Sequence, residues 1–103
     1  MRRDSRLSGV VAEQLALNYL QKQGLNLLAR NFRTRRGEID LIMRDNAHLV
    51  FVEVRFRQSS AFGSAEESIT QQKCRRLTAA ALAYMQSQKL TDNVSARFDA
   101  VAI

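Results

Sequence analysis

The chain has 103 residues, of which 46% are hydrophobic and 25% are charged, a composition typical of a folded domain and not of a disordered segment. We expect a single domain over residues 1–103, with neither a membrane span nor a signal peptide, because no apolar run approaches membrane-spanning length. The single cysteine, Cys74, excludes an internal disulfide and fits a reducing cytoplasm. The net charge of +6, carried mostly by arginine, favours a polyanionic partner such as nucleic acid and leaves a homodimer open.

The first predicted element is a helix that either Ser5 or Ser8 can cap and that runs to about residue 23. Gly24 follows it as a C-terminal stop signal. Its predicted apolar face consists of Ala12, Leu15, Ala16, Tyr19 and Leu20. A strand is predicted over residues 25–33, and a basic turn over residues 34–37 leads out of it.

A β-hairpin is predicted over residues 37–57, because strand-forming residues flank a segment of turn composition at residues 45–48. A turn centred on Asn46 and Ala47 sets Asp45 opposite His48. Counting outward, Ile42 meets Phe51, Asp40 meets Glu53 and Glu38 meets Arg55, all on one face of the hairpin. The opposite face is expected to be wholly apolar: Ile39, Leu41, Met43, Val50, Val52, Val54 and Phe56.

The remaining elements are a loop over residues 58–68, a helix over about residues 70–88 and a strand over residues 95–103. A capping box over residues 64–67 and Ser68 are alternative caps of this second helix. Its apolar stripe consists of Cys74, Leu77, Ala81, Tyr84 and Met85. The expected fold class is therefore α/β, with the order αβββαβ. Because the chain ends on a strand without a stop signal, we expect that residues after 103 belong to the natural protein.

Two opposed carboxylates in the hairpin are its most informative feature. Asp40 and Glu53 would repel each other across the strands unless a positive charge lay between them. Oxygen ligands of this kind bind hard divalent cations, which activate water and stabilise charge in phosphodiester hydrolysis. Two interpretations therefore stand: a metal site, or a half-solvated sheet with ordinary ion pairs such as Glu38 with Arg55.

Glu13 is a second informative acidic residue. Its neighbours at helical spacing are apolar, and a carboxylate among them is costly to bury unless it is paired or binds a cation. It either completes an acidic cluster with the hairpin or lies at the rim of the apolar face and reaches water.

These residues and the element order resemble the restriction-endonuclease-like superfamily and its PD-(D/E)xK active site. Within that superfamily the chain is similar to the YraN-like family of small bacterial predicted endonucleases, which is related to archaeal Holliday junction resolvases. The resemblance covers nearly the whole chain through the segments GVVAEQLALNYL, NFRTRRGEIDLI, FVEVRFR, FGSAEESITQQKCRRLTAAALAYM and RFDAVAI.

The resemblance implies a mixed central sheet flanked by helices in a restriction-endonuclease-like core. It implies Asp40 and Glu53 as ligands of Mg²⁺ or Mn²⁺ and Glu13 as an acidic catalytic residue from the first helix. The hairpin itself offers the backbone carbonyl of Val54 as a further candidate ligand. Supporting roles are implied for Glu38 and Gln71.

Arg55 departs from the pattern of the family, which usually has lysine two residues after the glutamate. Arginine cannot lose its proton, so Arg55 could orient water or stabilise negative charge as a catalytic residue but could not act as a general base.

Five further basic residues are candidates for binding the nucleic-acid backbone: Arg33, Arg35, Arg36, Lys73 and Arg76. The sequence thus predicts a metal-dependent endonuclease acting on DNA, with branched or structured DNA expected from the resolvase relationship. The first alternative is a non-catalytic nucleic-acid-binding module of the same fold, in which Arg55 has disabled the chemistry. The second is a protein-interaction domain whose arginines contact an acidic partner.

Overall fold

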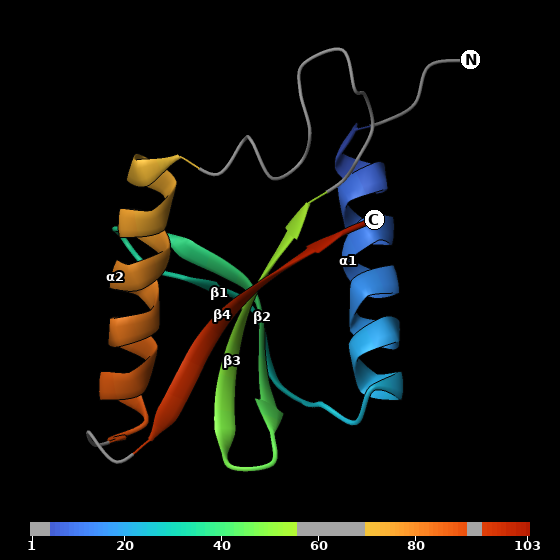
Figure 1. The fold of residues 1–103 in the computed structure, drawn as a ribbon. Helices are drawn as coiled ribbons and strands as arrows, with labels where there is room; N and C mark the ends of the chain where they lie inside the picture. Colours follow the sequence, from blue (N-terminus) through green and yellow to red (C-terminus); the bar gives the residue numbers. More distant parts are fainter. Residues whose placement is uncertain (1–4, 56–69, 91–93) are drawn as a thin grey trace.

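The computed structural model describes residues 5–55, 70–90 and 94–103, which form two helices and a four-stranded sheet. In chain order the elements are α1 (Ser5–Lys22), β1 (Asn26–Arg33), β2 (Glu38–Asp45), β3 (His48–Arg55), α2 (Gln71–Ser87) and β4 (Ser95–Ala102). Figure 1 shows the sheet between the two helices, with α1 covering one face and α2 the other. This arrangement confirms the predicted αβββαβ order and the mixed α/β class, and it is consistent with a restriction-endonuclease-like core.

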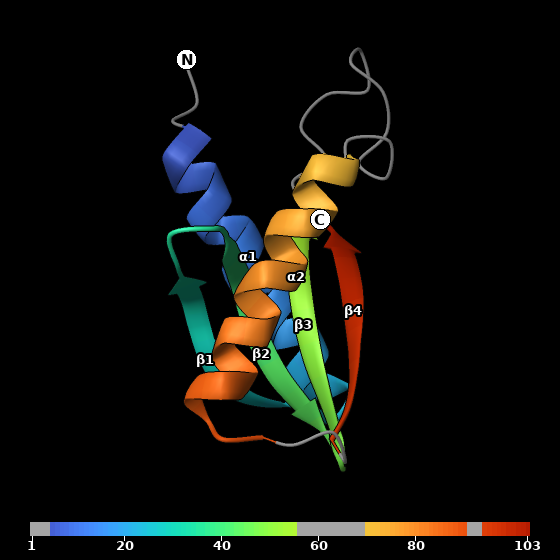
Figure 2. The ribbon, with the colours of Figure 1, turned by 90° about the vertical axis from the view of Figure 1, so that its left-hand side faces the viewer.

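The sheet has the strand order β1-β2-β3-β4. The first three strands are antiparallel neighbours joined by short connections, whereas β4 runs parallel to β3. A parallel neighbour requires a crossover connection, and α2 provides it. Figure 2 shows α2 lying across the face of the sheet that this crossover covers. The central strands β2 and β3 are therefore buried on both faces.

The core has one apolar cluster on each face of the sheet. On the α1 side, Ala16, Leu17 and Leu20 pack against Leu41 and Val52. On the α2 side, Ala80, Ala81 and Tyr84 pack against a second set from the sheet, namely Ile39, Ile42, Leu49 and Phe51. Each helix thus fixes its position by burying small and branched side chains against the sheet.

The helix ends follow local chain chemistry. Gly24 adopts a φ of 97°, and the Leu25 N–H donates to the Leu20 carbonyl at 3.1 Å, which ends α1 with the predicted glycine signal. At α2, the cap is Thr70, whose side chain accepts the Lys73 N–H at 3.1 Å. The predicted capping box over residues 64–67 and the predicted cap Ser68 lie outside the described residues, and so does Phe56.

The predicted hairpin register is confirmed from the turn as far as the pair Leu41–Val52. Asp45 pairs with His48, Ile42 with Phe51 and Leu41 with Val52. The predicted ion pair of Glu38 with Arg55 is wrong, because Glu38 pairs across the other edge of β2 with Arg33 at 3.2 Å. Arg55 instead contacts Glu53.

Ile39 lies on the face opposite to the one predicted. It packs with Ile42 on the α2 side, although Leu41 packs on the α1 side, so strict alternation is interrupted around Asp40. The facing strand is irregular at the same level, where Asn31 adopts a left-handed φ of 52° between the pairs Arg30–Leu41 and Phe32–Ile39. The left-handed backbone at Asn31, the kink of β1, thus lies opposite Asp40, where the alternation of β2 is interrupted.

Only part of the apolar face predicted for each helix is buried. Ala12, Ala16 and Leu20 are buried, but Leu15 and Tyr19 of the predicted face are 48% and 54% exposed. On α2, Ala81 and Tyr84 are buried and Cys74 is exposed. None of the helices in the described part of the chain has the length and apolar character needed to cross a membrane.

Candidate metal and nucleic-acid site

Asp40 and Glu53 line one open cavity of about 630 Å³ between the sheet, the β1–β2 turn and the start of α2. The other walls combine the turn with the first turns of the helix: Arg33, Thr34, Arg35, Gly37, Glu38, Val54, Thr70, Gln72, Lys73, Arg76 and Leu77. Four basic and three acidic side chains therefore meet here. The hairpin carboxylates come together as predicted, in the part of the sheet beyond the Leu41–Val52 pair.

Asp40 is held by the backbone of the neighbouring strand. Its Oδ2 accepts the Val54 N–H at 2.8 Å, just beyond Leu41–Val52, the last backbone pair that links β2 to β3. Burial, followed by the charges of Glu53 and Glu13, raises the pKa of Asp40 from 3.8 to about 6, against the opposing effect of the Val54 hydrogen bond. The carboxyl group thus sits where a cation would favour its charged form.

Glu53 is the one buried charged residue of the described core, with a side chain 11% exposed. Its Oε2 forms ion pairs with two side chains: Arg55 Nη1 from the same strand at 2.8 Å and Lys73 Nζ from α2 at 2.5 Å. Two positive partners offset the desolvation of a buried carboxylate. Glu53 is therefore fixed from the strand and from the helix at the same oxygen.

The chemistry of this pair fits a magnesium-type ion. Across residues 5–55, 70–90 and 94–103, no three His, Cys, Asp or Glu side chains gather into a metal cluster. Mg²⁺ needs no such cage, because it keeps several waters and takes one or two carboxylates together with substrate phosphates. The pKa of Asp40 is raised mainly by burial and further by the charge of Glu53, and a cation bound between the two carboxylates would oppose both effects.

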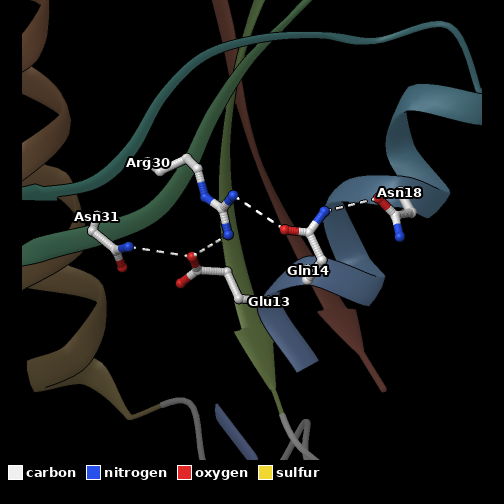
Figure 3. A network of polar contacts seen from close by, with 5 residues as sticks. All are labelled: Glu13, Gln14, Asn18, Arg30 and Asn31. Atoms are coloured by element: carbon white, nitrogen blue, oxygen red, sulfur yellow. Dashed lines mark hydrogen bonds and ion pairs between the residues drawn. The ribbon is translucent and has the colours of Figure 1, made fainter. Parts of the chain in front are cut away.

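Glu13 is occupied by partners of its own (Figure 3). Its Oε1 accepts Arg30 Nη2 at 3.0 Å and Asn31 Nδ2 at 3.2 Å, and Arg30 also donates to Gln14 Oε1 at 3.2 Å. The network ties α1 to β1 at the kink. Glu13 still influences the site through its charge, which contributes to the raised pKa of Asp40.

The other predicted residues divide by position. Arg33, Arg35, Lys73 and Arg76 line the cavity together with Glu38 and Val54. Arg36 lies on an adjoining hollow between the same turn and the outer side of α2. Gln71 does not line the cavity, whereas its neighbour Gln72 does.

The basic turn is locked onto α2. A Cβ atom at Gly37 would lie 2.2 Å from the Arg76 carbonyl oxygen, so only glycine permits this approach. Within the turn, Thr34 Oγ1 accepts the N–H groups of Arg36 and Gly37, both at 3.1 Å. These contacts hold the arginines of the turn beside those of the helix.

Lys73, predicted from the sequence to bind the nucleic-acid backbone, also contacts Glu53, which the sequence pattern did not predict. A signal for the contact was present, since Lys73 lies one helical turn before Leu77 on the stripe that continues to Tyr84 and faces the sheet. Thr34 and Thr70 were also missed as cavity residues, and the pattern of their segments gave no sign of it.

Comparison with known proteins identifies the family. The model of the family described as "Uncharacterised protein family UPF0102" matches residues 12–103. The chain belongs to this family. The match confirms the resemblance to the YraN-like family that the motifs indicated.

Individual UPF0102 relatives are similar over most of the chain. A UPF0102 protein of Coxiella burnetii (strain RSA 331 / Henzerling II) is 50% identical over 92% of this chain and 79% of its own length. One from Nitrosococcus oceani is 53% identical over 92% of this chain and 77% of its own. One from Lachnoclostridium phytofermentans is 44% identical over 97% and 85%. Their names state family membership and no activity.

Proposed function

We propose that this UPF0102 protein is a metal-dependent endonuclease that hydrolyses DNA, with branched or structured DNA as its substrate class and the cytoplasm as its location. The observation that carries the proposal is the placement of Asp40 and Glu53 in a cavity walled by four basic side chains. Carboxylates that hold a cation and cations that hold phosphate are the two components that phosphodiester hydrolysis requires.

Asp40 and Glu53 would hold Mg²⁺ or Mn²⁺, with the Val54 carbonyl as a further ligand. When bound, the ion would orient the phosphate, activate a water and offset charge in the transition state. The reaction adds one water across a P–O ester bond, which leaves a phosphate monoester and a free hydroxyl group.

The protein groups prepare this site in three ways. The Val54 N–H orients Asp40, and Arg55 orients Glu53 from the strand. Arg33, Arg35 and Arg76 supply donors for phosphate oxygens along the cavity wall. Glu13 pairs with Arg30, and its charge contributes to the raised pKa of Asp40, so Glu13 has a supporting role beside the catalytic one implied by the resemblance.

One observation favours the alternative of a non-catalytic binding module. Glu53 is already paired with two cations, and among the described residues no third His, Cys, Asp or Glu side chain completes a metal-binding cluster with Asp40 and Glu53. In that case the same basic cavity would bind the nucleic-acid backbone without hydrolysis.

The test is a cleavage assay on single-stranded, duplex and branched DNA with Mg²⁺ or Mn²⁺. The variants are Asp40→Ala, Glu53→Ala and Arg55→Lys, with Asp45→Ala as the matched control because Asp45 lies in the same strand but pairs with Arg97. We expect the first two to lower the rate by about 100-fold or more and the control to leave it unchanged. Salt-sensitive binding without cleavage by any variant would establish the binding module instead.

A further inference from the structure

We propose that Lys73, rather than Arg55, is the cation that contacts the phosphate being cleaved, and that Arg55 serves to hold Glu53 in place. The inference rests on the proposed nuclease function and assigns a substrate contact within it. It also explains how the site can operate with arginine at position 55.

The two cations share one carboxylate oxygen but differ in what else they reach. Lys73 lines the cavity beside Asp40, and its side chain is 37% exposed. Arg55 does not line the cavity, and its side chain is only 16% exposed. A phosphate entering the cavity therefore meets the lysine and not the guanidinium.

Lys73 also has N–H donors that its contact with Glu53 does not use. An ammonium group carries three N–H donors, and the contact with Glu53 Oε2 uses one of them. The flexible stem of lysine allows Nζ to keep Glu53 while it donates to a phosphate oxygen.

The backbone that carries Lys73 is fixed on both sides. Its N–H donates to the capping side chain of Thr70, so the residue sits in the first turn of α2. One turn later Leu77 packs against the sheet, and the Arg76 carbonyl abuts Gly37 of the basic turn. The backbone position of Lys73 is thus fixed by the cap and the packing of α2.

The first test measures the contact without cleavage, in EDTA. Binding of labelled DNA is compared for a set of duplexes and branched DNAs, each with one neutral methylphosphonate at a successive linkage. We expect one linkage whose neutralisation weakens wild-type binding about tenfold but leaves Lys73→Met binding unchanged, because that variant has already lost the contact. Arg76→Met, a cavity cation on the same helix that does not pair with Glu53, should still respond at that linkage.

The second test locates the contact relative to the chemistry. In Mg²⁺, wild-type protein should cleave at the linkage identified in EDTA. Lys73→Met should lower the single-turnover rate at saturating DNA by about 100-fold, and Lys73→Arg should recover part of it. Thermal unfolding controls for folding, since Arg55 still neutralises Glu53 in these variants.

The outcomes separate the two proposals. Wild-type cleavage that persists in Lys73→Met, or equal methylphosphonate sensitivity in both proteins at every linkage, overturns the role of Lys73 alone. Absence of wild-type cleavage overturns the nuclease function, and the contact is still decided by the binding set in EDTA.

Discussion

At the scale of single residues, Asp40 determines how the site depends on pH. Its pKa is raised to about 6, and a metal ion binds only the deprotonated carboxylate. We expect the affinity for Mn²⁺ to be constant above pH 7 and to fall about tenfold for each pH unit well below 6. Calorimetric titration between pH 5 and 8 measures this. An affinity that does not change across that range would contradict the assignment of Asp40 as a ligand.

The same carboxylate makes the protein less stable at neutral pH. A pKa raised in the folded state means that the folded protein binds this proton more tightly. The contribution of Asp40 to stability is therefore fully present below pH 4 and is lost as pH rises through about 6. Asp40→Asn keeps an acceptor for the Val54 N–H and removes the charge. We expect it to raise the free energy of unfolding by about 1–2 kcal/mol at pH 7.5, after discounting for solvent screening, and by nothing at pH 3.5. Denaturant unfolding at the two pH values is the measurement.

At the scale of elements, the turn between β1 and β2 depends on its contact with α2. Gly37→Ala would place a methyl carbon against the Arg76 carbonyl, so the turn must move away from the helix. We expect a loss of about 1–3 kcal/mol in stability and weaker DNA binding, because the arginines of the turn separate from those of α2. Gly9→Ala is the matched control, since nothing lies within 4 Å of its Cβ position in α1. Equal effects of the two substitutions would argue against the locked turn.

The elements and the hairpin register were predictable because they depend on local chemistry. The turn at Asn46, where φ is 57°, and strict alternation fixed the pairs from Asp45–His48 to Leu41–Val52. Alternation failed at Asp40, since the left-handed backbone of Asn31 lies in a neighbouring strand and leaves no mark on the periodicity of β2. Ile39 was therefore placed on the wrong face.

The candidate site was predictable in part for the same reason. Asp40 and Glu53 belong to one hairpin, so counting along its strands brought them together. The contact of Lys73 with Glu53 joins residues 20 positions apart through the crossover, whose geometry depends on how α2 packs on the sheet. Likewise, the occupation of Glu13 by Arg30 and Asn31 follows from the kink and not from the helix that carries Glu13.

At the scale of the whole molecule, which carries a net charge of +6, four basic side chains line the cavity between the sheet, the β1–β2 turn and α2. Each phosphate contact releases counterions, so we expect Arg35→Ala to reduce the slope of log binding constant against log salt by about one. Lys22→Ala is the control, because Lys22 ends α1 on the opposite face of the sheet. Fluorescence anisotropy at several salt concentrations measures both, and identical slopes would place the nucleic acid elsewhere.

The two cations paired with Glu53 affect how stable the folded protein is when divalent ions are scarce. The charge of this buried carboxylate is balanced by Arg55 and Lys73 before any ion arrives, so folding does not wait for one. Metal-dependent miniature domains such as zinc fingers unfold when the ion is withdrawn. Here we expect EDTA to leave the melting temperature within about 2 °C of its value in millimolar Mg²⁺, because a weakly bound ion stabilises little. Changes in the concentration of free divalent ion would then switch DNA hydrolysis on and off, while the protein stays folded throughout.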